Sequence, residues 1–124
     1  MASDGSVYVS DTGNNRIQRF TSEGVFVTKW GMLGTSDGEF SSRTAVAAAS
    51  DGSVYVADRD NYRIQKFSSG GVFVTKWGTR GADDGQFDYP SGHNNAVDIA
   101  VASDGSVYVS ERGNQRIQKF SVGP

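Results

Sequence analysis

One hexapeptide occurs three times in this chain and constrains its fold more than any other feature. Asp-Gly-Ser-Val-Tyr-Val begins at positions 4, 51 and 104, so the copies lie 47 and 53 residues apart. Each copy continues with Arg-Ile-Gln-Arg/Lys-Phe. A repeat of this period is a module too small to bury its own core. We therefore expect a single domain built as an array of three like modules, over roughly residues 1–43, 44–96 and 97–124.

The apolar residues within each module follow a period of two, which is typical of β-strands. Val7 and Val9, for example, alternate with Tyr8. Both faces of the predicted strands carry apolar residues, so each sheet needs a cover on both sides. Dipeptides such as Asp4-Gly5 supply the positive φ angles of tight hairpin turns. We expect an all-β fold.

Charge and composition exclude several classes of protein. The 12 Lys and Arg against 14 Asp and Glu leave a formal net charge of −2, and the chain has no cysteine. One histidine, His93, cannot supply the three protein ligands of a catalytic zinc site. The N-terminus lacks the signal-peptide pattern, and no apolar run approaches the ~20 residues of a membrane span. We expect no metal, no cofactor and no membrane association, and we favour a cytoplasmic location.

The order of motifs in the first two modules, of which the third repeats the earlier part, resembles the NHL repeat. These motifs are apolar-Tyr-Val-Ala/Ser-acid, Asn-x-Arg-Ile-Gln-x-Phe, a strand ending in Trp-Gly, and Gly-x-x-Asp-Gly-x-Phe. The resemblance implies a β-propeller with blades of four antiparallel strands, commonly six to a ring. Family members include protein-binding and RNA-binding platforms, and distant relatives are metal-dependent lyases. The chain departs from the pattern at Arg43, where proline is usual, at Glu111, where aspartate is usual, and by an insertion within 91–98.

The resemblance assigns ten strands to three blades. The first module supplies strands B, C and D, the second supplies A to D, with A near 45–49, and the third supplies A near 99–102, B and C. Three blades cannot close a ring alone and would expose two apolar blade faces. We therefore expect a homodimer that closes a six-bladed propeller. The alternative is a fragment of a larger propeller with no independent function, and an engineered origin also stays open.

An acidic residue and an arginine five positions apart recur in every module. The pairs are Asp11 and Arg16, Asp58 and Arg63, and Glu111 and Arg116. Because they recur whatever loop lies between them, we interpret them as structural, tying their own loop or bridging to the next blade. A ring of ligand-binding charges is the alternative. Trp30 and Trp77 are also assigned structural roles.

Polar and aromatic residues of one loop face are the candidate ligand contacts. They lie in the loop after each acidic residue of these pairs and in the connection that carries the insertion. The candidates are Asn14, Asn15, Arg59, Asp60, Tyr62, Tyr89, His93, Asn94, Asn95, Arg112 and Asn114.

The predicted function is a non-catalytic scaffold that presents this loop face to a protein, peptide or small polar ligand. Single-stranded RNA is the alternative ligand, because arginine and aromatic side chains can stack on bases. Interleaved acidic residues and a sequence pI of about 5.2 weigh against RNA. The glycines are explained by turns, and no nucleophile–histidine–acid spacing is present, so an enzyme is disfavoured.

Overall fold

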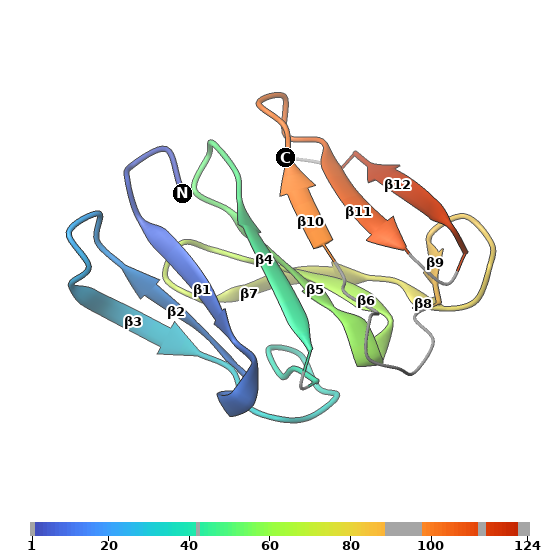
Figure 1. Cartoon of the computed structure of the whole chain (residues 1–124), viewed down its shortest axis with the longest axis horizontal. Coiled ribbons are helices and arrows are strands. Elements are labelled where there is room, and N and C mark those ends of the chain that lie inside the picture. Colours follow the sequence, from blue (N-terminus) through green and yellow to red (C-terminus); the bar gives the residue numbers. More distant parts are fainter. Residues whose placement is uncertain (1, 42, 89–97, 112–113, 122–124) are drawn as a thin grey trace.

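The computed structural model describes residues 2–41, 43–88, 98–111 and 114–121. In this part of the chain, three antiparallel sheets follow one another along the sequence (Figure 1). The first sheet comprises β1 (Val7–Asp11), β2 (Arg16–Phe20) and β3 (Phe26–Trp30). The middle sheet comprises β4 (Thr44–Ala48), β5 (Val54–Asp58), β6 (Arg63–Phe67) and β7 (Phe73–Trp77). The last sheet comprises β10 (Asp98–Val101), β11 (Val107–Glu111) and β12 (Arg116–Phe120). The all-β prediction is confirmed.

The three sheets share one strand order and one register. Strands pair in sequence order in each sheet, and each acidic residue of the repeated pairs lies directly opposite its arginine. In the described part of the chain, only the middle sheet has four strands. Among the described residues, the first sheet has no counterpart of β4 and the last has no counterpart of β7. This is the strand allocation expected from the repeats.

A short 3-10 turn joins the two strands that carry each acid–arginine pair. The turns described are η1 (Thr12–Asn14) and η2 (Arg59–Asn61). Each is followed by a residue in the left-handed conformation, Asn15 at φ 55° and Tyr62 at φ 54°. Asparagine adopts this conformation readily, whereas a bulky tyrosine does so only when its surroundings hold it there. The compact turn places the acidic residue opposite the arginine.

The connection between the middle and last sheets contains a small parallel pair that the sequence did not predict. β8 (Thr79–Arg80) pairs with β9 (Gln86–Phe87), and an isolated parallel bridge joins Leu33 to Phe40 at the equivalent place before the middle sheet. Each pairing closes a loop whose phenylalanine side chain is fully buried. At the start of the earlier loop, a Cβ on Gly31 would lie 2.6 Å from the Phe40 ring, so only glycine allows this approach.

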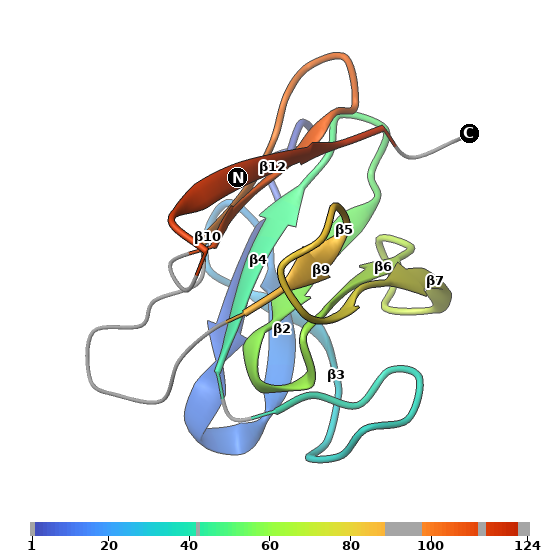
Figure 2. The same ribbon diagram turned by 90° about the vertical axis from the view of Figure 1, so that its right-hand side faces the viewer.

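The hydrophobic core lies in two layers between successive sheets. The layer between the first and middle sheets is formed by Ile17, Phe40, Val54, Val56 and Phe67. The layer between the middle and last sheets is formed by Ala49, Tyr55, Ala57, Ile64, Phe87, Ile99, Val107 and Val109. Figures 1 and 2 show the sheets fanned around β4, which contacts both β1 and β10. The middle sheet is thus covered on both faces, and each end sheet on one.

Candidate functional site

The acid–arginine pair of the middle sheet shares one sheet face with a glutamine. Asp58 pairs with Arg63 and Val56 pairs with Gln65, so these side chains project to the same side. All three polar side chains are buried. Asp58 Oδ2 accepts a hydrogen bond from Arg63 Nε at 3.1 Å. Because buried charged groups need partners, the rest of the guanidinium must be satisfied elsewhere.

Arg63 and Gln65 hold the turn that precedes the middle sheet. Arg63 donates from its Nη atoms to three backbone carbonyl oxygens, those of Thr35 at 2.7 Å, Ser36 at 3.1 Å and Glu39 at 2.7 Å. Gln65 Nε2 donates to the same Glu39 carbonyl at 2.8 Å. Gln65 Oε1 accepts from the backbone N–H of Gly38 at 2.8 Å. These side chains therefore recognise the backbone of the turn.

Two further side chains complete this set. Asp58 Oδ1 accepts from the backbone N–H of Ser41 at 2.8 Å. Asn61 Nδ2 donates to the Gly34 carbonyl and to Asp58 Oδ2, each at 2.9 Å. We call Asp58, Asn61, Arg63 and Gln65 the turn-binding cluster of the middle sheet. It binds residues 34–41, which connect the first sheet to the middle one.

The last sheet repeats this cluster with Glu111, Asn114, Arg116 and Gln118. Arg116 donates to three carbonyl oxygens, those of Ala82 at 3.0 Å, Asp83 at 2.9 Å and Gln86 at 2.9 Å. Gln118 donates to the Gln86 carbonyl at 2.8 Å and accepts from the Gly85 N–H at 2.9 Å. Glu111 accepts from the Asp88 N–H at 2.8 Å, and Asn114 donates to Glu111 and to the Gly81 carbonyl. The longer glutamate side chain preserves every contact that Asp58 makes to the turn backbone.

The first sheet has the same four side chains without a bound turn. Asp11 Oδ2 accepts from Arg16 Nε at 2.9 Å, from Asn14 at 3.0 Å and from Gln18 at 3.1 Å. Within the described residues, none of the three donors reaches a turn backbone. The Asp11 side chain is 25% exposed, against 0% for both Asp58 and Glu111. Hydrogen bonds from Asn14 and then Arg16 lower the pKa of Asp11 below its usual value of 3.8.

The predicted loop-face residues lie in different environments. Asn14 and Asn114 belong to the clusters just described, and Asn15 occupies the left-handed position after η1. Arg59 is only 3% exposed and pairs with the exposed Asp60 at 2.7 Å. The Tyr62 ring lies under the Arg80 guanidinium, 5.3 Å from it. The remaining candidates lie outside the described residues: Tyr89, His93, Asn94, Asn95 and Arg112.

Both tryptophans pack between sheets. The Trp30 ring centroid lies 5.6 Å from that of Phe67, and the Trp77 centroid lies 5.4 Å from that of Phe120. Each tryptophan belongs to one sheet and each phenylalanine to the next, so these pairs contribute to the junctions.

Sequence reasoning missed the glutamine of each cluster and also Asn61. The signal was present, because Gln18, Gln65 and Gln118 each follow the paired arginine by two positions and so share its strand face. Gln65 and Gln118 bind backbone atoms of a turn. Backbone atoms are the same in every residue, so the sequence does not indicate this contact.

Neither a metal-binding group nor a membrane-spanning helix occurs in the described part of the chain. There, no group of three or more histidine, aspartate or glutamate side chains is placed to hold a metal ion. That part also contains no helix long and apolar enough to cross a membrane.

Comparison with known proteins gives a family and a set of similar structures. A family model described as NHL repeat matches residues 1–20, 44–67 and 94–120. No match was found among curated protein sequences. Similar solved structures include a streptogramin B lyase (17% identity, TM-score 0.58) and a virginiamycin B lyase from Staphylococcus aureus (17%, 0.58). An auxiliary nutrient binding protein from Bacteroides thetaiotaomicron is also similar (17%, 0.62).

These structural alignments cover nearly all of this chain but a minor part of each neighbour. The alignment with the streptogramin B lyase covers 97% of this chain and 38% of the lyase, and that with the virginiamycin B lyase covers 98% and 39%. The alignment with the nutrient binding protein covers 94% of this chain and 35% of that protein. The chain therefore spans less than two fifths of the length of these structures. At 17% identity the likeness shows a propeller-like fold alone.

Proposed function

This chain belongs to the NHL repeat family, and we propose that it is a non-catalytic binding scaffold that works as a homodimer. In this proposal, the end sheets bind a second copy of the chain. The loop face binds a protein, a peptide or a small polar ligand. The propeller-like fold and the exposed faces of the end sheets support this function.

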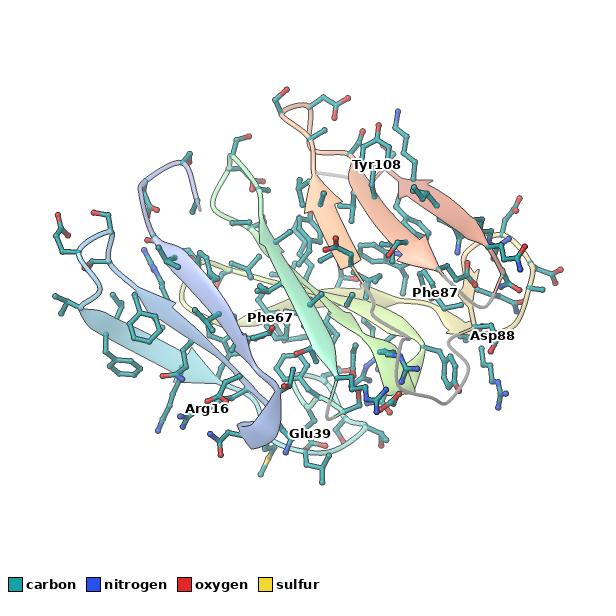
Figure 3. The ribbon with its side chains drawn as sticks, viewed as in Figure 1. Arg16, Glu39, Phe67, Phe87, Asp88 and Tyr108 are labelled. Carbon is teal, nitrogen blue, oxygen red and sulfur yellow. The ribbon has the colours of Figure 1, made fainter. Side chains whose placement is uncertain are left out.

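The exposure of three equivalent isoleucines carries the proposal. Ile17 and Ile64 are 0% and 1% exposed, because the following sheet covers each of them, whereas Ile117 is 71% exposed. Tyr108 pairs with Lys119, which lies two positions after Ile117 in β12, so Tyr108 and Ile117 are on the same face of the sheet. Tyr108 is also exposed (Figure 3). A face that is buried in two sheets and open in the third is typical of an interaction surface.

The opposite end of the array offers a complementary face. Val9 is 41% exposed on the first sheet, whereas its equivalents Val56 and Val109 are fully buried. Inside the chain, the isoleucine face of one sheet packs on the valine face of the next. The last sheet of one copy can therefore pack on the first sheet of another. With three modules per chain, two copies give the six blades of a common propeller, and closure prevents growth into a fibre.

Light scattering coupled to size exclusion tests the homodimer. The wild-type chain should have about twice the monomer mass of 13.2 kDa. Ile117→Asp should give a folded monomer, because it places a charge in the proposed interface. Val72→Asp is the matched control, since Val72 is 68% exposed in a hairpin loop outside both end faces. A monomeric wild type, or a dimeric Ile117→Asp variant, would refute the assembly.

Two assays test the binding class. Poly(U) RNA should bind weakly, and tight binding that falls steeply with salt would replace this proposal by the RNA alternative. A streptogramin B compound incubated with the protein should stay intact by mass spectrometry. This compound is chosen because one structural neighbour is named a streptogramin B lyase. Conversion of the compound would show that the chain is an enzyme.

A further inference from the structure

The turn-binding cluster occurs three times, and two of its copies hold a turn. In the middle and last sheets, all four side chains contact the backbone of the preceding turn. In the first sheet, the same side chains are Asp11, Asn14, Arg16 and Gln18, and within the described residues they bond only to one another. Asp11 Oδ1, the counterpart of the oxygen that accepts the Ser41 N–H, accepts no hydrogen bond from a described residue.

The first-sheet cluster is also accessible and has an apolar platform beside it. Arg16 lies at the end of the first sheet in Figure 3, and its partner Asp11 is 25% exposed, whereas the equivalent Asp58 and Glu111 are 0% exposed in the clusters that hold a turn. In the bound turns, the phenylalanine packs on a strand phenylalanine, with Phe40 at 5.7 Å from Phe67 and Phe87 at 5.8 Å from Phe120. Phe20 holds this position in the first sheet and is partly exposed.

The chemistry of the site identifies its occupant. The clusters contact carbonyl oxygens and backbone N–H groups, and Asp11 neutralises Arg16, so the site suits a polar backbone better than a free anion. The two bound turns share the pattern Gly-x-x-Asp-Gly-x-Phe, whose second glycine has a positive φ in both, at Gly38 and Gly85. Both turns of this kind in the chain are already held by their own sheets, by Arg63 and Arg116.

We propose that Asp11, Asn14, Arg16 and Gln18 form an acceptor site for a Gly-x-x-Asp-Gly-x-Phe turn donated by another polypeptide. The donated turn places its carbonyl oxygens on Arg16 and Gln18, and its phenylalanine on Phe20. The inference rests on the proposed function, because it names one kind of partner for the scaffold.

The probe is a synthetic peptide of residues 78–88, capped at both ends and labelled with fluorescein. Fluorescence anisotropy measures its binding to the full chain. The protein carries Ile117→Asp, so that binding is measured on a monomeric chain. We expect saturable binding in this background. Arg16→Ala should weaken it by about tenfold or more, because several charge-assisted hydrogen bonds are lost.

Matched variants separate recognition of the turn from simple charge attraction. Arg16→Lys keeps the charge but loses the planar guanidinium that reaches several carbonyl oxygens, so it should also weaken binding. Arg19→Ala removes an arginine whose strand position pairs with Tyr8 on the opposite face, and it should leave binding unchanged. Phe87→Ala in the peptide should weaken binding by about tenfold, because the apolar anchor is lost.

Three results would overturn the acceptor site. They are binding weaker than about 1 mM, equal binding by Arg16→Ala, and equal binding by Arg16→Lys. Circular dichroism of each variant confirms that the sheets remain folded. Failure of the homodimer proposal is seen separately, in the mass of the peptide-free wild type.

Discussion

The first and middle sheets contain nearly the same strands in very different surroundings. β2 reads Arg-Ile-Gln-Arg-Phe and β6 reads Arg-Ile-Gln-Lys-Phe, and each pairs in the same register with the strand before it. The ion pair in the middle sheet is nevertheless buried, whereas that of the first sheet is partly exposed. Local sequence therefore sets the strand and its pairing, and the neighbouring module decides how much each side chain contributes to stability.

The largest expected difference is between the two arginines. Arg63→Ala should lower the free energy of unfolding by about 3–5 kcal/mol, because it removes the cation that pairs with the buried Asp58 carboxylate and the side-chain donor of the Thr35 and Ser36 carbonyls. Arg16→Ala should cost much less, because its ion pair with Asp11 is partly exposed to water. Urea unfolding of both variants measures the difference. Equal losses would show that the turn contacts contribute little.

The two isoleucines give the next largest contrast. Ile64→Ala should cost about 2–5 kcal/mol, because it opens a cavity between the middle and last sheets. Ile117→Ala should leave the stability of the monomer nearly unchanged, because that side chain is mostly exposed. Thermal unfolding under dilute conditions compares them. A large loss for Ile117→Ala in a proven monomer would mean that the end face is covered within one chain.

A smaller effect is expected from two glycines in turns of different kinds. Gly38→Ala should cost about 1–2 kcal/mol, because φ is +81° in the turn held by the middle sheet. Gly13 lies in η1 of the first sheet without a positive φ, and a Cβ added there would meet open space, so Gly13→Ala is the control and should cost nothing. Chemical unfolding of both variants is the measurement, and equal stability would contradict the strain at Gly38.

The smallest effect is the acid titration of the first-sheet cluster. The pKa of Asp11 is lower in the folded protein than its usual value of 3.8, so the ionised carboxylate stabilises the fold above pH 3.8. This stabilisation is lost as the pH falls through the lowered pKa. Asn14→Ala should raise the Asp11 pKa towards 3.8, since the Asn14 hydrogen bond is the first cause of the shift. NMR titration of the carboxyl carbons measures this. Asp104 is the control, because a hydrogen bond from the Ser106 backbone lowers its pKa, and that pKa should be the same in the Asn14→Ala variant.

Some features were predictable from the sequence and others were not. Period-two apolar residues and glycine turns predicted the strands, and the repeated acid–arginine spacing predicted a shared structural unit. The left-handed Tyr62, the β8–β9 pairing and the burial of Arg59 were not predicted. Each of these depends on residues brought close by folding, and none leaves a regular spacing in the sequence.

The amino-acid sequence was enough to specify the all-β class, the three modules and the glycine-containing turns, because these depend on short-range alternation and on glycine conformations. The folded array was needed to establish which copy of the same motif is buried, which turn the middle and last clusters hold, and that the first cluster contacts no turn among the described residues. The physical reason is that burial and hydrogen bonding to a turn backbone depend on the module that lies alongside. Identical residues such as Ile64 and Ile117 cannot carry that information.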